Sequence, residues 1–256
     1  MAAMALDLPT LLRAYAVGLF PMADDREATS LYWVQPERRA ILPLDGFCLS
    51  RSLRKTLRAD RFTVTADRAF VQVISGCAES TAGRPSTWIN PEIERAFVAL
   101  HRQGLAHSIE CWREADGEGG DIGGRQLVGG LYGLALGRAF FGESMFSRAR
   151  DASKVAMAWL VARLRVGGYQ LLDCQFMTPH LASLGAIEIS SEDYSGLLAE
   201  ALADGPGAFE ALDGLTGAAA LPWSESPESG AAFLTTRTVS GPVSGQVIAQ
   251  LVTQTS

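Results

Sequence analysis

The sequence has few cysteines, no net positive charge and no long apolar run, and each absence excludes a class of protein. Its four cysteines, Cys48, Cys77, Cys111 and Cys174, are scattered without paired spacing, which favours a reducing compartment over a disulfide framework. A net charge of −6 over 256 residues gives no global basic field, so nucleic-acid binding would need a local patch. Arg13 interrupts the N-terminal segment, and no uncharged apolar run reaches the ~18 residues of a membrane span, so we expect neither a signal peptide nor a transmembrane helix.

Motifs that bind cofactors are missing as well. The glycines of residues 127–133 are not followed by the Gly-Lys-Ser/Thr of a phosphate-binding loop. Residues 126–131 depart at their last position from the pyrophosphate loop of acyl-CoA transferases. His101, His107 and Cys111 fit no zinc-ligand spacing. These patterns therefore give no sign of a zinc site, a nucleotide phosphate loop or a CoA pyrophosphate loop.

Residues 127–147 are apolar and glycine-rich and contain a single carboxylate, Glu143. Aromatic and branched residues on either side of a turn near Gly137 predict two strands, over residues 127–136 and 139–146. An unpaired charge in such a setting is costly to bury or becomes protonated. Glu143 is therefore either a core residue with satisfied hydrogen bonds or part of a pocket wall with a chemical role.

A second pair of polar residues ends the predicted buried strand over residues 169–174. Asp173 and Gln175 lie two positions apart, so in a strand their side chains share a face, while Cys174 faces the core. The pair is either a salt-bridged strand end or a site that orients an amine for proton transfer. Cys174 and His180 form no motif for a thiol nucleophile, because a buried cysteine is usually inert.

Positive charge is concentrated in residues 50–61. Ser50 or Ser52 can cap a short helix there, with an apolar pair, Leu53 and Leu57, on the opposing side. The cations recur at three- and four-residue steps, so most of them share a face that is either simply solvated or binds phosphate. They are Arg51, Arg54, Lys55, Arg58 and Arg61.

The remaining pattern predicts an α+β protein. Tyr32 and Trp33 are adjacent in a strand-like segment, so one can be buried while the other is exposed; Trp33 is either a packing residue or a stacking platform for a base. Antiparallel strands followed by a crossover helix and a further strand suggest the sheet of N-acyltransferases, by analogy only. The predicted helices span residues 8–17, 67–77, 91–103, 152–166, 179–184 and 191–202. The other predicted strands span 62–65, 106–112 and 186–189, together with a strand-like segment over 31–42 that Pro36 interrupts. A loop is expected over 113–126 and a last strand over 247–252.

Nine short motifs occur in the order found in one protein family. Together they run over roughly residues 8–198, and by them the sequence resembles the bacterial leucyl/phenylalanyl-tRNA–protein transferases. The motifs are Ala14–Met22, Ser50–Lys55, Thr87–Ile89, Ala106–Glu110, Leu127–Gly133, Gly142–Ser147, Ala152–Lys154, Leu172–Gln175 and His180–Gly185.

This resemblance implies a fold and an activity. The expected fold is a small N-terminal α/β domain (residues 1–61) and a larger acetyltransferase-like (GNAT-like) mixed-sheet domain (residues 62–202), followed by a C-terminal extension (residues 203–256). The implied activity moves Leu or Phe, and Met less well, from aminoacyl-tRNA to the N-terminal Arg or Lys of a protein, which marks that protein for degradation. The resemblance implies a cytoplasmic monomer that needs no metal or organic cofactor and does not associate with a membrane.

The resemblance also implies residue roles. Asp173 and Gln175 are similar to the catalytic pair, and Glu143 to the residue that meets the incoming amine. Our hypothesis is that Asp173 orients Gln175 and draws the proton of the amine, while Gln175 positions the nucleophile. The other implied contacts are Trp33 and Trp112 to the tRNA 3′ adenosine, Leu131, Phe140, Ser144 and Met145 to the transferred amino acid, and Arg51, Arg54, Lys55 and Arg58 to the tRNA backbone.

Several departures from the family pattern accompany it. Cys48 stands in place of an expected histidine and Tyr32 in place of a tryptophan, the loop over residues 113–126 is longer than expected, and the tail after residue 203 lies largely outside the resemblance. Two other functions remain open on the residues alone. One is an acyl-CoA-dependent N-acetyltransferase, which the missing pyrophosphate loop disfavours. The other is a non-enzymatic RNA-binding protein, which would leave Glu143 and Asp173 without a purpose.

Overall fold

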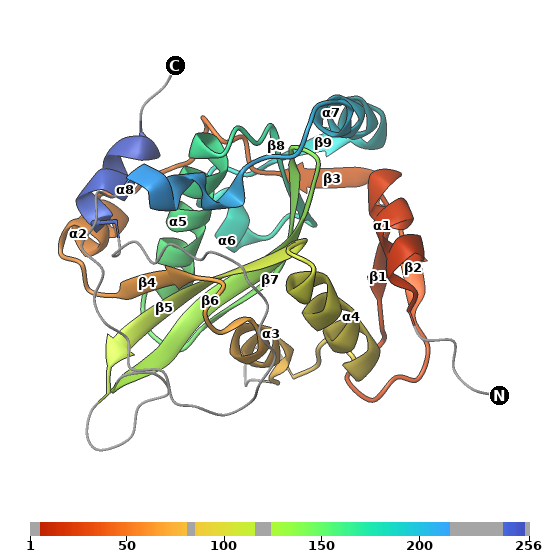
Figure 1. The fold of residues 1–256 in the computed structure, drawn as a ribbon, viewed down its shortest axis with the longest axis horizontal. Coiled ribbons are helices and arrows are strands. Elements are labelled where there is room, and N and C mark those ends of the chain that lie inside the picture. Colours follow the sequence, from red (N-terminus) through yellow and green to blue (C-terminus); the bar gives the residue numbers. More distant parts are fainter. Residues whose placement is uncertain (1–5, 81–84, 116–123, 216–242, 254–256) are drawn as a thin grey trace.

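A mixed seven-stranded sheet forms the centre of the molecule, shown by a computed structural model that describes residues 6–80, 85–115, 124–215 and 243–253 (Figure 1). Its strand order is β4-β5-β6-β7-β8-β3-β9. All neighbouring strands are antiparallel except β7 and β8, which are parallel and are connected by helix α5 (Ala152–Val166). The strands are β3 (Arg38–Ile41), β4 (Thr63–Ala66), β5 (Ala106–Glu114), β6 (Arg125–Leu136), β7 (Ala139–Ser147), β8 (Leu171–Gln175) and β9 (Ile187–Ser190).

Helices cover both faces of this sheet, because the central strands are apolar on both sides. On β7, Phe140 joins the hydrophobic cluster around α5, while Phe141 joins the opposite cluster. Figure 1 shows α5 on one side of β5–β7 and α3 and α4 on the other. The α5 face also carries α2 (Arg51–Arg58), α6 (Pro179–Ala182), the 3-10 helix η1 (Phe209–Leu215) and α8 (Gly245–Leu251), and the other face carries α1 (Leu8–Ala16), α3 (Phe70–Ala78), α4 (Pro91–Arg102) and α7 (Ser191–Ala203).

Three of the predicted helix starts are confirmed at atomic detail, whereas the helix expected from residue 67 begins only at Phe70, as α3. The side chains of Asp7, Ser50 and Asn90 each accept a hydrogen bond from a backbone N–H in the first turn of α1, α2 and α4, respectively. Such caps satisfy donors that have no partner within the helix. The capping residues in the local sequence therefore determine where these helices begin.

The N-terminal segment forms a separate two-stranded sheet of β1 (Phe20–Met22) and β2 (Tyr32–Val34). Tyr32 and Trp33 are both exposed, 46% and 37% respectively, so the expectation that one would be buried is wrong. The chain then leaves this small sheet, and β3 pairs with β8 and β9 inside the large one. The expected boundary at residue 61 therefore does not coincide with the change of sheet, which falls between Val34 and Arg38.

The C-terminal strand expected over residues 247–252 is wrong, because this segment lies in and just after helix α8. Its buried residues Ile248, Ala249 and Val252 follow a helical spacing and pack in the cluster around α5. The N–H of Gly245 donates to Asp60 Oδ1 (2.7 Å). A Cβ at Gly245 would lie 2.1 Å from Leu57 O, so the contact between α8 and α2 requires glycine. Of the expected hairpin loop over residues 113–126, both ends belong to β5 and β6, and residues 116–123 lie outside the described part of the chain.

Candidate functional site

Glu143 is the extra residue of a β-bulge between β6 and β7. Tyr132 pairs with Ser144 and Gly133 pairs with Gly142, so Glu143 has no partner across the ladder. A Cβ on Gly133 would lie 2.3 Å from Phe141 O, so only glycine fits opposite the bulge. Bulges re-aim side chains and are frequent next to active sites. Here the bulge turns the carboxyl group towards α1 and β8.

The carboxyl group of Glu143 is buried and only half satisfied. Its Oε1 accepts hydrogen bonds from Tyr15 Oη (2.8 Å) and Gln175 Nε2 (2.9 Å). Its Oε2 has no hydrogen-bond partner among the described residues. Burial raises the pKa of Glu143 to about 8, although the hydrogen bonds from Tyr15 and Gln175 act in the opposite direction. A carboxyl group with such a pKa can take up and release a proton near neutral pH.

Gln175 connects this carboxyl group to Asp173. It ends β8 with a φ of 63°, a left-handed conformation that residues other than glycine adopt rarely and that is often found at functional sites. Its backbone N–H donates to Asp173 Oδ1 (2.8 Å), and its side-chain amide donates to Glu143. Because the amide nitrogen is bound to Glu143, the amide oxygen is held in a defined orientation.

Asp173 is fully buried and surrounded by donors. Arg39 Nε contacts both carboxylate oxygens (2.9 and 3.1 Å), and Arg39 Nη2 and Tyr194 Oη donate to Oδ2 (2.5 and 2.9 Å). Burial raises the pKa of Tyr15 and of Tyr194, so both phenols remain protonated donors at neutral pH. Asp173 therefore forms a saturated ion pair, whereas Glu143 keeps a free acceptor.

The structure thus brings together the three residues predicted as catalytic and adds three that sequence reasoning missed. Asp173, Gln175 and Glu143 form one hydrogen-bonded group. The sequence could not show this contact, because Glu143 lies in a different motif from the other two residues. The missed residues are Tyr15, Arg39 and Tyr194. A signal existed for Arg39, because a cation directly before the apolar residues 40–42 was a sign of a buried ion pair.

The residues predicted to hold the transferred amino acid lie mainly on the other face of the sheet. Leu131 and Phe140 are fully buried in the cluster around α5, and the ring of Phe140 stacks on Phe209. Met145 packs against the same cluster but is only half-buried, like Ser144. Strand alternation causes this separation, because Phe140 and Asp173 point to opposite faces.

The two tryptophans predicted to contact tRNA differ in environment. Trp33 is exposed on β2. Trp112 is buried on β5, and its indole N–H donates to Thr65 Oγ1 (2.7 Å). Trp112 is thus a packed, hydrogen-bonded core residue in this structure, while Trp33 presents a ring to solvent.

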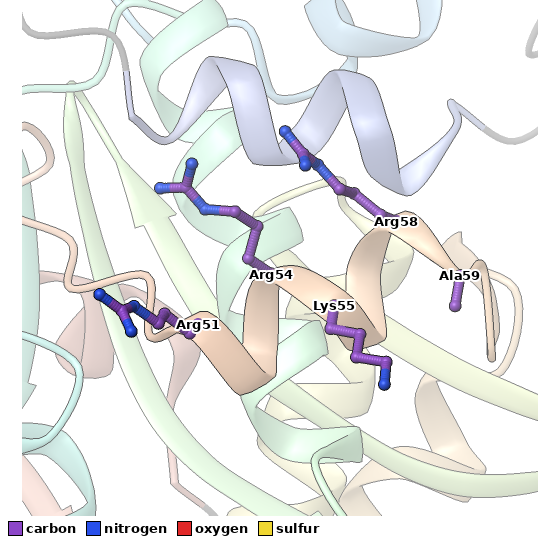
Figure 2. Close-up of a pocket in the computed structure, with 5 residues that line it drawn as sticks. All are labelled: Arg51, Arg54, Lys55, Arg58 and Ala59. Carbon is purple, nitrogen blue, oxygen red and sulfur yellow. The ribbon is translucent and has the colours of Figure 1, made fainter.

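Helix α2 presents a cationic surface. Its predicted apolar pair, Leu53 and Leu57, is buried, and an open hollow of about 350 Å³ lies along its outer side. Figure 2 shows the basic side chains projecting from the helix, with Arg54 and Arg58 extending in the same direction. Within the described ranges, no cation of this hollow forms an ion pair with a carboxylate. The hollow is lined by Arg51, Arg54, Lys55, Arg58 and Ala59.

His101 and His107 have local structural partners, whereas the buried Nε2 of His180 has no hydrogen-bond partner among the described residues. His107 Nδ1 lies 2.8 Å from Asp67 Oδ2, and His101 Nδ1 lies 2.8 Å from the carbonyl of Ala106. Burial raises the pKa of the Cys174 thiol well above its usual value, so it is not an activated nucleophile. The described residues contain no cluster of three or more His, Cys, Asp or Glu side chains that could hold a metal ion. None of the helices in the described segments is long and apolar enough to cross a membrane.

Comparison with known proteins assigns this chain to a family. The model of the family leucyl/phenylalanyl-tRNA protein transferase matches residues 41–199, and the model of the N-terminal domain of the same family matches residues 4–37. The chain therefore belongs to the leucyl/phenylalanyl-tRNA–protein transferase family, and it is an enzyme of the transferase class.

Curated relatives agree with this assignment, one of them over nearly the whole chain. A leucyl/phenylalanyl-tRNA–protein transferase of Rhizorhabdus wittichii is 59% identical over 256 residues, which cover 98% of this chain and 99% of the relative. A transferase of the same name from Zymomonas mobilis is 61% identical over 74% of this chain and 67% of its own length. A third, from Paramagnetospirillum magneticum, is 59% identical over 76% of this chain and 88% of its own length.

Proposed function

We propose that this enzyme transfers Leu or Phe, and Met less well, from aminoacyl-tRNA to the N-terminal Arg or Lys of acceptor proteins in the cytoplasm. The transferred Leu or Phe would become the new N-terminal residue of the acceptor and would mark the acceptor for degradation. Membership of the family supports transfer from aminoacyl-tRNA to a protein. The observation that carries the proposal is the Glu143–Gln175 pair, a buried carboxyl and amide group with a free acceptor atom.

The chemistry needs an amine and an activated ester. The α-amine of the acceptor attacks the carbonyl carbon of the aminoacyl ester, a C–N bond forms, and the C–O bond to the tRNA ribose breaks. The amine must lose a proton, and the ribose oxygen must gain one. Because the ester is already activated, this balance requires no ATP and no CoA.

We assign proton acceptance to Glu143 and positioning to Asp173, which revises the hypothesis made from the sequence. Asp173 is fully buried and accepts from Arg39, Tyr194 and the Gln175 backbone, so it has no oxygen free for the amine. Glu143 keeps Oε2 unpartnered among the described residues, and its pKa is raised to about 8. In this assignment the amide oxygen of Gln175 accepts a second N–H of the amine and orients it.

We assign the other substrate contacts according to how exposed each predicted residue is. Trp33 and the cations of α2 are accessible to tRNA, and we propose that they contact the 3′ adenosine and the phosphate backbone. Ser144 and Met145 are half-buried beside Glu143 in sequence, and we propose that they contact the transferred side chain. Leu131, Phe140 and Trp112 are buried, and their proposed part is to support this region from within the core.

We also propose that the large sheet resembles that of N-acetyltransferases. Four strands, β4 to β7, follow one another in antiparallel order, and α5 then leads to the parallel strand β8. This order matches the antiparallel strands, crossover helix and further strand that the sequence analysis expects. It does not by itself specify the acyl donor.

The test is to incubate the protein with Leu-tRNA labelled on leucine and a peptide that begins with Arg, without ATP or CoA. We expect label on this peptide and none on a matched peptide with an acetylated N-terminus. Glu143→Gln should lower kcat by about 10²–10⁴-fold, the usual contribution of a proton-transfer group. No transfer from Leu-tRNA or Phe-tRNA to N-terminal Arg or Lys, together with binding of acetyl-CoA, would favour an N-acetyltransferase instead.

A further inference from the structure

We propose that Arg39 and Tyr194 are positioning residues that act through Asp173 to hold Gln175 in its reactive conformation. This inference rests on the proposed aminoacyl transfer and adds to it two residues that contact no substrate. The four residues form a continuous hydrogen-bonded chain that ends on the amide beside Glu143.

Arg39 is buried at the point where four parts of the chain meet. Only 1% of it is exposed, and its guanidinium lies 4.7 Å from the centre of the Phe20 ring and 4.5 Å from that of Tyr194. Two of its nitrogens bind Asp173, and the third, Nη1, donates to the carbonyl of Gly18 (3.0 Å). All of its nitrogens are therefore used, and the guanidinium has a single orientation.

Stability alone is a weak reason for such an arrangement. Removing both charges from water is expensive, and buried ion pairs can often be replaced by apolar residues without loss of stability. What this pair provides is rigidity, because Arg39 on β3 and Tyr194 on α7 hold the carboxylate of Asp173 on β8 from two directions.

Rigidity at Asp173 is transmitted directly to Gln175. The carboxylate accepts the backbone N–H of Gln175, whose φ of 63° is strained for a residue with a side chain. Ala40, next to Arg39, pairs with Gln175 across the sheet. If Asp173 shifts or rotates, this conformation relaxes, and the amide leaves its place beside Glu143.

Two conservative substitutions test this proposal. Tyr194→Phe keeps the ring beside Arg39 and removes a single donor to Asp173, so kcat should fall about tenfold. Arg39→Lys keeps the charge but loses the two-nitrogen contact, and a displacement of the amide by about 1 Å would lower kcat on the order of 100-fold. The KM for aminoacyl-tRNA should be unchanged, because the cations of α2 are not affected.

Arg163→Lys is the matched control. Arg163 is also buried (3% exposed), binds Asp213 through two nitrogens and lies over the ring of Phe209. It lies on α5, in contact with η1 and not with the Glu143 group. We expect this variant to lower the melting temperature but to leave kcat unchanged below that temperature. An equal fall of kcat in Arg163→Lys would overturn the proposal, because general loss of stability would then explain the effect.

A double-mutant cycle with Gln175→Ala shows whether the effect passes through Gln175. Tyr194→Phe should have no further effect on kcat in the Gln175→Ala background. A tenfold fall in both backgrounds would overturn the proposal. Hydrogen exchange of the Gln175 backbone amide provides a readout without substrate, and we expect faster exchange in Tyr194→Phe. An unchanged exchange rate would also contradict the proposal, even if the wild type showed no aminoacyl transfer and the proposed function had failed.

Discussion

Two acidic side chains on neighbouring strands have opposite environments. Asp173 has a guanidinium and a phenol as partners, whereas Glu143 has a phenol and an amide and, among the residues that the structure describes, no cation in direct contact. Burial therefore acts on Glu143 without full compensation, and its pKa rises to about 8. The same effect raises the pKa of buried Glu110 on β5 to about 7. These differences arise from single contacts between residues far apart in sequence.

The raised pKa of Glu143 predicts how stability depends on pH. Its pKa of about 8 in the folded protein exceeds the ~4.3 of an unfolded chain, so between these values the folded state binds more protons. The free energy of unfolding should therefore fall as pH rises from 5 to 8, by up to ~1.4 kcal/mol per pH unit for this group. Glu143→Gln should remove this part of the slope, as measured by urea unfolding at several pH values.

A control on the protein surface accompanies this measurement. Glu200→Gln changes an exposed carboxylate of α7 and should keep the wild-type slope. Glu110 contributes in the same direction, so a smaller fall should remain in Glu143→Gln. Identical pH dependence of the wild type and Glu143→Gln would mean that Glu143 ionises normally in the folded protein.

At the scale of elements, the bulge in β7 determines where Glu143 points. The sequence predicts both strands of the β6–β7 hairpin and the turn at Gly137, and all three are confirmed. It does not predict the bulge, because a one-residue offset depends on the pairing of two strands and not on the composition of either.

The bulge yields a pair of matched glycine substitutions. Gly133→Ala places a Cβ 2.3 Å from Phe141 O, so the backbone must shift, at a cost of ~1–3 kcal/mol in unfolding free energy and with loss of transfer activity. Gly142→Ala, opposite Gly133 in the ladder, meets its nearest atom at 3.4 Å, an ordinary contact, and should be tolerated. Urea unfolding and the transfer assay measure both effects. Equal tolerance of the two substitutions would show that the backbone at the bulge adapts without cost.

At the scale of the whole molecule, charge is distributed unevenly. The chain carries a net charge of −6, yet α2 presents cations without acidic partners in the described parts of the chain. A local basic surface on an acidic protein attracts a polyanion in one orientation and repels it elsewhere. The cations lie on the α5 face, and Glu143 is directed towards α1 on the other. A tRNA bound by α2 would therefore have to pass the edge of the sheet to deliver its 3′ end.

This distribution predicts a salt-dependent affinity for aminoacyl-tRNA. Each phosphate contact contributes a slope of about −0.7 to −0.9 to log K against log salt, so Arg51→Ala combined with Arg54→Ala should reduce the slope by about 1.4–1.8. The value of kcat at saturating tRNA should stay the same. Arg102→Ala, an exposed cation on α4, is the control and should not change the slope. A wild-type affinity that did not change with salt would exclude α2 as a phosphate-binding surface.

The sequence by itself determined the features that depend on neighbours along the chain. The local sequence placed the starts of α1, α2 and α4, and the spacing of Leu53 and Leu57 separated the buried side of α2 from its cationic side. These signals are local, because a cap or an amphipathic face involves residues three or four positions apart. Motifs in a family order also determined the family, and this is confirmed.

Only the tertiary structure decided the features that depend on distant partners. Arg39 and Asp173 are 134 positions apart, and Tyr15 and Glu143 are 128 apart, so no local pattern could pair them. The short apolar segment 247–252 fits a strand or a helix equally well, and packing against α2 and α5 selected the helix. The tertiary structure likewise separated the two buried carboxylates into a paired one and a protonatable one, because desolvation and hydrogen bonding exist only once the chain has folded around them.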